Sequence, residues 1–315
     1  MNTRHLVDPD LLPLIDLAPT DPITPDNLAA TRAAMNVRFE GLPRPSITPT
    51  VAFAQGRDGA PDVPLFIYDP GGQGSRAAIL HIHGGGMIAG RAELTVFGTA
   101  PIALGLGVVV VSVDYRLAPE TPFPGLQEDC YAALEWLFVH ANELRIEPAR
   151  IAVSGDSAGG GLATALALML RDRGGPKLAA QLLTYPMLDY RTGGPEDPYL
   201  NATTGEFVWT RERNQFGWQS LRGGYIPADT RKGWFSPMLA DNLLHLPPTW
   251  IGTGSLDLFL DEDAAFARCL SAAEVSVDFR VYAGGVHGFN TVSAASLSRR
   301  FAADFETAVR RHLVI

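Results

Sequence analysis

The chain has 315 residues and a formal net charge of −9, with 46% hydrophobic and 19% charged residues. This composition is typical of a globular protein with a sizeable core, and it excludes a disordered chain. The negative charge argues against nucleic acid or an anionic membrane surface as a partner. Cys130 and Cys269 are too few for a disulfide framework, and no residue cluster indicates a metal site.

The first residues lack the pattern of a signal peptide, because Pro13 and Asp16 interrupt the apolar run 11–17. The longest apolar runs, 105–113 and 163–170, are too short to cross a bilayer. We therefore expect a cytoplasmic protein without membrane insertion.

Prolines interrupt residues 1–45, where residues 26–39 predict a helix with Asp26 as its cap and a partial apolar face. From residue 47 the pattern changes to β-structure. The continuous β-branched run 108–113 is typical of a strand buried on both faces. Three earlier strands are predicted at 47–53, 63–68 and 77–83.

Helices and strands alternate from residue 127 onward, which is typical of βαβ units. The alternation predicts an α/β fold, with a mostly parallel sheet and helices on both faces. The predicted strands are 151–153, 178–184, 249–252 and 277–282, and the predicted helices are 127–144, 162–170, 261–273 and 297–313.

Residues 190–232 do not follow this alternation. They are rich in glycine and proline and include the aromatic residues Phe207, Trp209, Phe216 and Trp218. Long insertions at the carboxyl ends of strands usually shape the site there, so we predict a lid that lines an apolar substrate pocket. The alternative is a surface insertion whose aromatic side chains only pack on the domain.

A G-x-S-x-G motif, Gly155 to Gly159 with Ser157 at its centre, lies between a predicted strand and a predicted helix. A strand that reverses directly into a helix needs small residues at these two flanking positions. The motif predicts that Ser157 is a nucleophile at the tip of a sharp turn. The alternative is a glycine-rich turn that happens to contain serine.

A serine nucleophile needs a base, and the base needs an anion that holds its tautomer. Among the seven histidines, His287 lies on a glycine-containing loop directly after the strand 277–282, which suits the base. Asp257 directly follows the strand-like residues 250–254 and lies between Ser157 and His287 in the chain, as this architecture expects. Asp257 is therefore the predicted acid, and Asp261 remains the second candidate.

Acyl transfer develops negative charge on the carbonyl oxygen, and rigid N–H donors usually stabilise it most. Gly84, Gly85 and Gly86 directly follow a predicted strand, and glycines let backbone amides face a ligand. The residue after the nucleophile, Ala158, is expected to supply another donor. These residues predict an oxyanion hole. The spacing of the glycines fits neither a phosphate loop nor a dinucleotide-binding motif.

Together these motifs resemble the hormone-sensitive-lipase-like branch of the α/β-hydrolases, the bacterial family IV carboxylesterases. The acid motif of that branch usually has proline where this chain has Leu258. The matching segments are His83–Gly86, the D-Y-R-L-A-P-E loop 114–120, the G-D-S-A-G elbow 155–159, Asp257–Glu262 and His287–Phe289.

The resemblance implies an α/β-hydrolase fold with an eight-stranded sheet and a helical cap. Residues 46–185 and 236–315 would form the catalytic domain, 1–45 a cap segment and 186–235 a cap insertion. It implies hydrolysis of carboxylic esters with short acyl chains through a Ser-His-Asp triad, without a cofactor, and a small-molecule ester as the partner. Its oxyanion donors are mainly Gly85, Gly86 and Ala158. The oligomeric state stays open, with a homodimer as one option.

Two further residues receive structural interpretations. Arg116 is expected to pair with an acid, and Asp156 to brace the elbow. Two other functions use the same parts: a hydrolase-fold receptor that binds a small ligand without turnover, and an amidase with the same triad. Retention of Ser157, Asp257 and His287 argues against the receptor.

Overall fold

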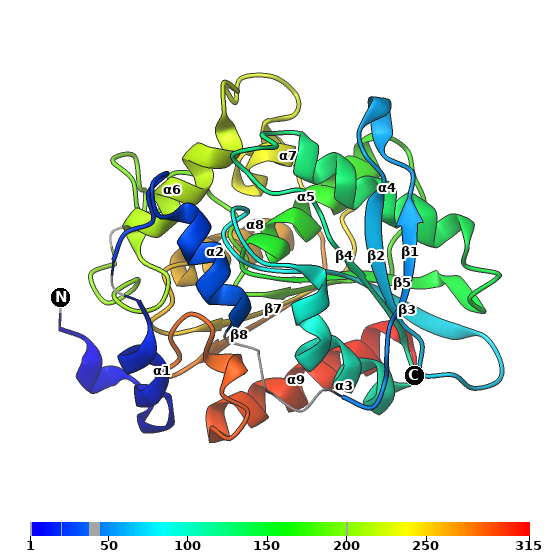
Figure 1. Ribbon diagram of the computed structural model, residues 1–315, viewed down its shortest axis with the longest axis horizontal. Coiled ribbons are helices and arrows are strands. Elements are labelled where there is room, and N and C mark those ends of the chain that lie inside the picture. Colours follow the sequence, from blue (N-terminus) through cyan, green and yellow to red (C-terminus); the bar gives the residue numbers. More distant parts are fainter. Residues whose placement is uncertain (1, 20, 38–44, 200) are drawn as a thin grey trace.

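The computed structural model describes residues 2–19, 21–37, 45–199 and 201–315 of the chain. These residues form one sheet of eight strands in the order β1-β2-β4-β3-β5-β6-β7-β8, with helices around it (Figure 1). β2 is antiparallel to β1 and to β4, and all other neighbours are parallel, so the predicted mostly parallel α/β sheet is confirmed. The strands are β1 (Thr50–Ala54), β2 (Val63–Tyr68), β3 (Arg76–Ile82), β4 (Val109–Val113), β5 (Ile146–Asp156), β6 (Gln181–Thr184), β7 (Thr249–Gly254) and β8 (Val277–Tyr282).

The sheet separates two apolar cores, because successive side chains of a strand point to opposite faces. In β3, Leu80 and Ile82 belong to one core and Ala77 and Ile79 to the other. α4, α5 and α8 pack on the first core, and α3 and α9 pack on the second (Figure 1). The helices are α1 (Leu12–Leu17), α2 (Leu28–Val37), α3 (Val96–Leu106), α4 (Gly125–Val139), α5 (Ala158–Asp172), α6 (Arg211–Arg222), α7 (Lys232–Phe235), α8 (Leu260–Ala272) and α9 (Ser296–Leu313).

Several boundaries differ from the sequence prediction. α3 was not predicted, because its sequence is apolar at almost every position and contains Pro101, so no helical periodicity stands out. β5 begins at Ile146, before the predicted 151, and α4 ends at Val139 instead of 144. The helix predicted over 26–39 is observed as α2, but it begins at Leu28, so the predicted cap Asp26 is not adjacent to its first residue; residues 38 and 39 lie outside the described residues.

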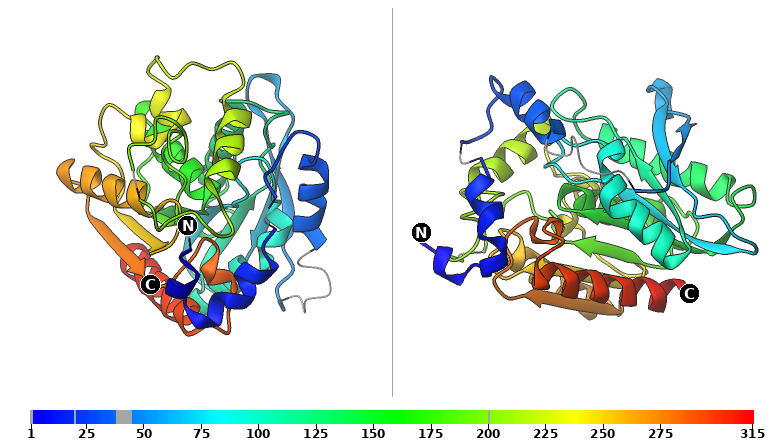
Figure 2. Two further views of the ribbon diagram at one scale, coloured as in Figure 1. Left: turned by 90° about the vertical axis from the view of Figure 1, so that its left-hand side faces the viewer. Right: turned by 60° about the horizontal axis from the view of Figure 1, so that its bottom comes forward.

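The carboxyl ends of β3, β5, β7 and β8 lie at the same edge of the sheet, because these strands are parallel. The insertion 186–235 follows β6 at that edge and carries α6 and α7. The N-terminal segment, residues 2–19 and 21–37, lies against this insertion (Figures 1 and 2). Thr3 Oγ1 donates to Glu206 at 2.6 Å. Arg213 of α6 donates to the carbonyls of Pro19 and Asp21 at 2.6 and 2.8 Å.

In the part of the chain that the structure describes, every helix is too short or too polar to span a membrane.

Candidate active site

Ser157 lies at the turn between β5 and α5 and has φ +58° and ψ −121°, a backbone conformation that residues other than glycine rarely adopt. The flanking glycines allow the backbone to pass closely. A Cβ on Gly155 would overlap the carbonyl of Gly159, and a Cβ on Gly159 would overlap the carbonyl of Ile82. The predicted sharp turn from strand to helix is therefore confirmed, with the serine at its tip.

His287 lies between Ser157 and Asp257. Its Nδ1 is 2.8 Å from Asp257 Oδ2, and its Nε2 is 3.0 Å from Ser157 Oγ. A carboxylate only accepts hydrogen bonds, so Nδ1–H is the donor and, in the neutral ring, Nε2 accepts from the serine hydroxyl. This tautomer leaves the histidine nitrogen next to the serine ready to take a proton.

The Asp257 carboxylate is fully buried and receives a second hydrogen bond, from the backbone N–H of Phe259 at 2.9 Å. The second candidate, Asp261, is directed elsewhere: its carboxylate accepts from Asn201 Nδ2 at 2.9 Å. Among the described residues, the carboxylate that contacts His287 is therefore that of Asp257.

Three aromatic rings surround the His287 ring. Tyr185, directly after β6, lies 4.6 Å away between ring centroids, and Phe259 packs its edge at 5.4 Å. Trp209 of the insertion lies 6.1 Å away. Only 8% of His287 is exposed, so these rings restrict its rotation and shield its hydrogen bonds from water.

The glycine turn after β3 approaches the elbow closely. A Cβ on Gly84 would lie 3.4 Å from Ser157 Cβ, and Gly85 and Gly86 have φ +121° and +61°. Within the described residues, neither the Gly85 N–H nor the Gly86 N–H has a hydrogen-bond acceptor. Ala158 is the first residue of α5, where a backbone N–H has no partner inside the helix. Within the described residues, the backbone N–H groups of Gly85, Gly86 and Ala158 thus lack an acceptor.

His83, which begins the glycine turn, has a structural role. Its ring stacks on Tyr115 with centroids 4.2 Å apart, and its Nδ1 donates to the Gly84 carbonyl at 2.8 Å. Burial lowers the pKa of His83 to about 4, so the ring is neutral at pH 7. The Tyr115 hydroxyl donates to the His83 carbonyl at 2.9 Å.

The two structural interpretations from the sequence are confirmed. Asp156 Oδ2 lies 3.1 Å from His81 Nε2 and so links β5 to β3 beside the elbow. Arg116 pairs with Asp129 of α4 through Nε–Oδ2 and Nη2–Oδ1 contacts of 2.9 and 2.7 Å.

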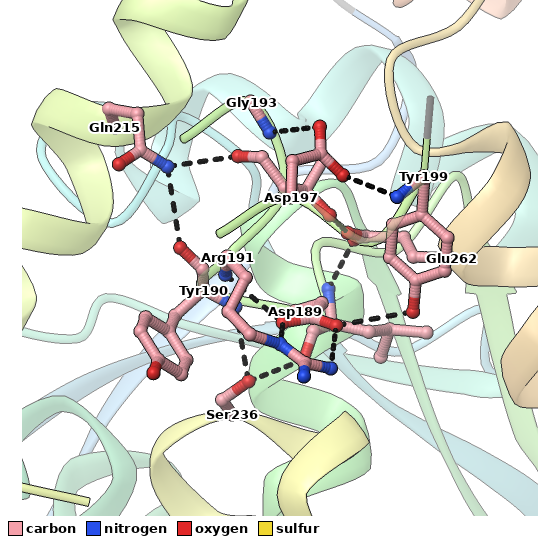
Figure 3. Close-up of polar contacts among 11 residues, drawn as sticks. Asp189, Tyr190, Arg191, Gly193, Asp197, Tyr199, Gln215, Ser236 and Glu262 are labelled. Atoms are coloured by element: carbon pink, nitrogen blue, oxygen red, sulfur yellow. Dashed lines mark hydrogen bonds and ion pairs between the residues drawn. The ribbon is translucent and has the colours of Figure 1, made fainter. Parts of the chain in front are cut away.

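A buried polar network, which the sequence did not reveal, ties the base of the insertion to α8. Figure 3 shows its two buried carboxyl groups, those of Asp189 and Glu262. Glu262 accepts from the Leu188 N–H at 2.7 Å and contacts the Thr192 hydroxyl. Burial raises the pKa of Glu262 well above its usual range, with the Asp189 charge as a second cause.

Asp189 binds the arginine and tyrosine side chains of this network (Figure 3). It is fully buried and accepts from Arg191 Nη2 at 2.7 Å and from the Tyr199 hydroxyl at 3.1 Å. Acidic residues in the first turn of a helix are common and usually face solvent. Glu262 does lie in the first turn of α8, but it points into the interior, and only the position of the insertion in space reveals this.

A surface cleft of about 790 Å³ lies between α8 and the loop residues Tyr199, Asn201 and Ala202, and Asp261 and Arg268 are part of its lining. The cleft does not include Ser157, Asp257 or His287, so it is distinct from the site described above. Among the described residues, no group of three or more His, Cys, Asp or Glu side chains is arranged to hold a metal ion.

Comparisons with known proteins agree with this geometry. Residues 79–291 match the family model described as "alpha/beta hydrolase fold". The chain is 34% identical to the carboxylic ester hydrolase LipN of Mycobacterium tuberculosis over 91% of this chain and 77% of LipN. It is also 34% identical to the carboxylesterase NlhH of the same species, over 91% of this chain and 89% of NlhH.

Solved structures are also similar over the whole chain. A bacterial heroin esterase has a TM-score of 0.90 and 36% identity, with 99% of each chain covered. A hyperthermophilic esterase from Pyrobaculum calidifontis has a TM-score of 0.83 and 29% identity, covering 98% of this chain and 99% of that one.

Proposed function

Because this chain belongs to the α/β-hydrolase family and is a carboxylic ester hydrolase of its hormone-sensitive-lipase-like branch, we propose that it cleaves short-chain esters with Ser157 as the nucleophile. The observation that carries the proposal is the position of His287, within hydrogen-bond distance of both Ser157 Oγ and Asp257.

In the proposed reaction, Ser157 Oγ attacks the ester carbonyl while His287 Nε2 takes its proton. Asp257 stabilises the imidazolium that forms. His287 then protonates the departing alcohol, and an acyl-enzyme ester remains on Ser157. Water, deprotonated by the same imidazole, attacks this ester and releases the acid and the free serine.

We assign the oxyanion to the N–H groups of Gly85, Gly86 and Ala158, with Gly84 allowing the turn to approach Ser157. The absence of competing acceptors for the first two supports this assignment within the described residues. Donors that are fixed before the reaction do not need to reorganise as charge develops.

We further propose that residues 1–45 and 186–235 form a cap on a catalytic domain of residues 46–185 and 236–315. Trp209 supports the preference for short chains. Its indole ring lies against Gly86, where it limits the room beside the reacting carbonyl. Trp209 is itself buried, and its Nε1 donates to Asn214 at 3.2 Å, which fixes the ring.

The decisive experiment compares wild type with Ser157→Ala on p-nitrophenyl acetate and butyrate. The variant is expected to lose hydrolysis by a factor of roughly 10⁶, as when a triad nucleophile is removed. Ser154→Ala, a buried serine of the same strand, is the matched control and should keep its activity. Wild-type rates in Ser157→Ala would rule out the proposed nucleophile.

Two substrate series define the reaction further. Rates across acyl chains from acetate to dodecanoate are expected to peak at short chains. An amide matched to the best ester is expected to react far more slowly. A faster amide reaction would reassign the enzyme as an amidase.

A further inference from the structure

We propose that Arg32 of α2 is a positioning residue that holds the glycine turn in the orientation its N–H donors need. The proposal rests on the function proposed above, in which these donors bind the oxyanion. It gives the N-terminal segment a part in the reaction beyond covering the site.

The Arg32 guanidinium binds the end of the turn directly. Its Nε donates to the Ile88 carbonyl at 2.6 Å, two residues after Gly86. Its Nη2 donates to the Ala118 carbonyl at 2.9 Å. Its two terminal nitrogens also bind the two carboxylate oxygens of Glu120 at 2.7 and 2.8 Å.

The turn needs such external contacts because it belongs to neither a helix nor a strand. Its internal bonds run from the Ile88 and Ala89 N–H groups to the Gly85 carbonyl, at 3.2 and 3.0 Å. The Met87 carbonyl accepts from the Ala118 N–H at 2.9 Å. Arg32 binds the carbonyl of Ile88, the next residue of the turn, and also the carbonyl of Ala118. It therefore connects the turn to the loop 114–120.

The opposite side of the turn is fixed by the insertion. The Trp209 ring lies against Gly86, and a Cβ on Gly217 of α6 would lie 2.7 Å from the Gly86 carbonyl. The turn is thus held between the insertion and the N-terminal segment. Removing Arg32 leaves the turn in contact with the insertion on one side only. An N–H donor that moves by about 1 Å then stabilises the transition state much less.

The ion pair stabilises the position of the guanidinium. Arg32 lowers the pKa of Glu120 to about 2, so the carboxylate is charged throughout the neutral range. Glu120 itself is largely exposed, whereas 25% of the Arg32 side chain is exposed. The carbonyl contacts, and not the exposed ion pair, are therefore expected to carry most of the effect.

The test measures kcat and KM for Arg32→Ala, Arg32→Lys and Glu120→Gln with p-nitrophenyl butyrate. We expect kcat to fall roughly 10- to 100-fold in Arg32→Ala while KM changes less than about 3-fold, since the donors act in the transition state. Arg32→Lys replaces the planar guanidinium, which has several donors, with a single ammonium group, so it should restore part of kcat. Glu120→Gln keeps both carbonyl contacts and should lose less than Arg32→Ala.

Arg4→Ala is the matched control. Arg4 lies on the same N-terminal segment and forms a bidentate pair with Asp16, at 2.5 and 3.0 Å, but it does not contact the turn. Both its kcat and its KM should stay at the wild-type value. Equal losses in Arg4→Ala and Arg32→Ala would reduce the role of Arg32 to general attachment of the segment.

A second readout does not depend on activity. Hydrogen exchange at the Ile88 and Ala89 amides should be faster in Arg32→Ala, and it should match wild type in Arg4→Ala. Unchanged kcat together with unchanged exchange would overturn the proposal, as would a rise in KM alone. The proposed function fails separately, if Ser157→Ala remains active, and the exchange result still shows whether Arg32 holds the turn.

Discussion

The edge of the sheet and the proposed cap are held in different ways. At the edge, backbone bonds fix the reactive residues: the Ser157 N–H donates to the Thr184 carbonyl at 2.9 Å, and the Leu256 N–H donates to the Gly285 carbonyl at 2.9 Å. The second bond joins the acid loop directly to the histidine loop. The proposed cap also has backbone bonds to the sheet edge, such as that of the Asp8 N–H to the Gly284 carbonyl at 3.0 Å, but it relies in addition on side chains. Arg32 and Glu262 bind backbone groups across its boundary, and Arg213 joins its two segments.

This difference predicts how each region responds to substitution. A side-chain change at the sheet edge removes a chemical group and leaves the backbone frame in place. A side-chain change in the cap removes an attachment, so it alters geometry and stability first. The following substitutions test this contrast, in order of decreasing expected effect.

Asp257→Asn is expected to lower kcat about 10⁴-fold with little loss of stability, because an amide can favour the wrong histidine tautomer without disturbing the loop. Asp261→Asn, four residues later, is the matched control and should keep full activity. Steady-state kinetics and thermal unfolding measure both effects. If Asp261→Asn lost as much activity as Asp257→Asn, the assignment of the acid would be wrong.

Gly86→Ala should displace the N–H of this residue and lower kcat roughly 10²- to 10³-fold, the typical effect of losing one oxyanion donor. Its φ of +61° strains alanine, and the new Cβ would overlap the Trp209 ring. Adding Trp209→Ala removes the overlap but not the backbone strain, so the double variant should recover only part of kcat. Gly98→Ala, in α3 with open space around it, is the control and should stay active.

Glu262→Ala should lower the free energy of unfolding by about 3 kcal/mol, because the Leu188 N–H loses its buried acceptor and a cavity remains. Glu262→Gln keeps the acceptor and the shape. Chemical denaturation measures both variants, and kcat of the glutamine variant should be close to wild type. A stable Glu262→Ala would show that the cap does not depend on this network.

The raised pKa of Glu262 also gives a pH dependence. Above about pH 4.3 the unfolded chain releases this proton while the folded chain keeps it, so folding becomes less favourable as pH rises. Glu262→Gln has no titrating carboxyl group at this position. The free energy of unfolding of the variant minus that of wild type should therefore be greater at pH 8 than at pH 5. An equal stability difference between the variant and wild type at the two pH values would contradict a raised pKa of Glu262.

Arg213→Met should cost about 2 kcal/mol of stability, since it removes the donors to Pro19 and Asp21 while keeping an apolar stem. Hydrogen exchange in residues 3–17 should become faster. Arg211→Met is the matched control, because Arg211 binds the carbonyls of Thr204 and Asn201 inside the insertion. Faster exchange of residues 3–17 in the control would show that the contact is not specific.

Much of the sheet was predictable from local pattern. β2 and β8 have the predicted bounds, since glycine-containing turns follow both strands. The three residues of the predicted triad were identifiable because each follows a strand, and parallel strands bring their carboxyl ends to one edge. Their distances agree with a triad, and their catalytic roles remain proposals.

The contacts of the cap were not predictable in the same way. Arg32 lies 56 residues from Ile88 in the chain, and Thr3 lies 203 residues from Glu206. No local pattern indicates which carbonyl an arginine reaches, because that depends on how two packed segments meet. The same reason hid Glu262, whose neighbours Asp261 and Asp263 look equivalent in the sequence although Asp261 is partly exposed.

The long separation between Thr3 or Arg213 and their partners also has a consequence for the order of assembly during synthesis. Thr3 and Pro19 are synthesised well before Glu206 and Arg213, so these contacts cannot form until the insertion has been made. The partners of Arg32, at positions 88, 118 and 120, are available much earlier. The partners that Arg32 needs are thus complete in the chain before those of Thr3 and Pro19, which separates the contacts of the N-terminal segment into an early and a late set.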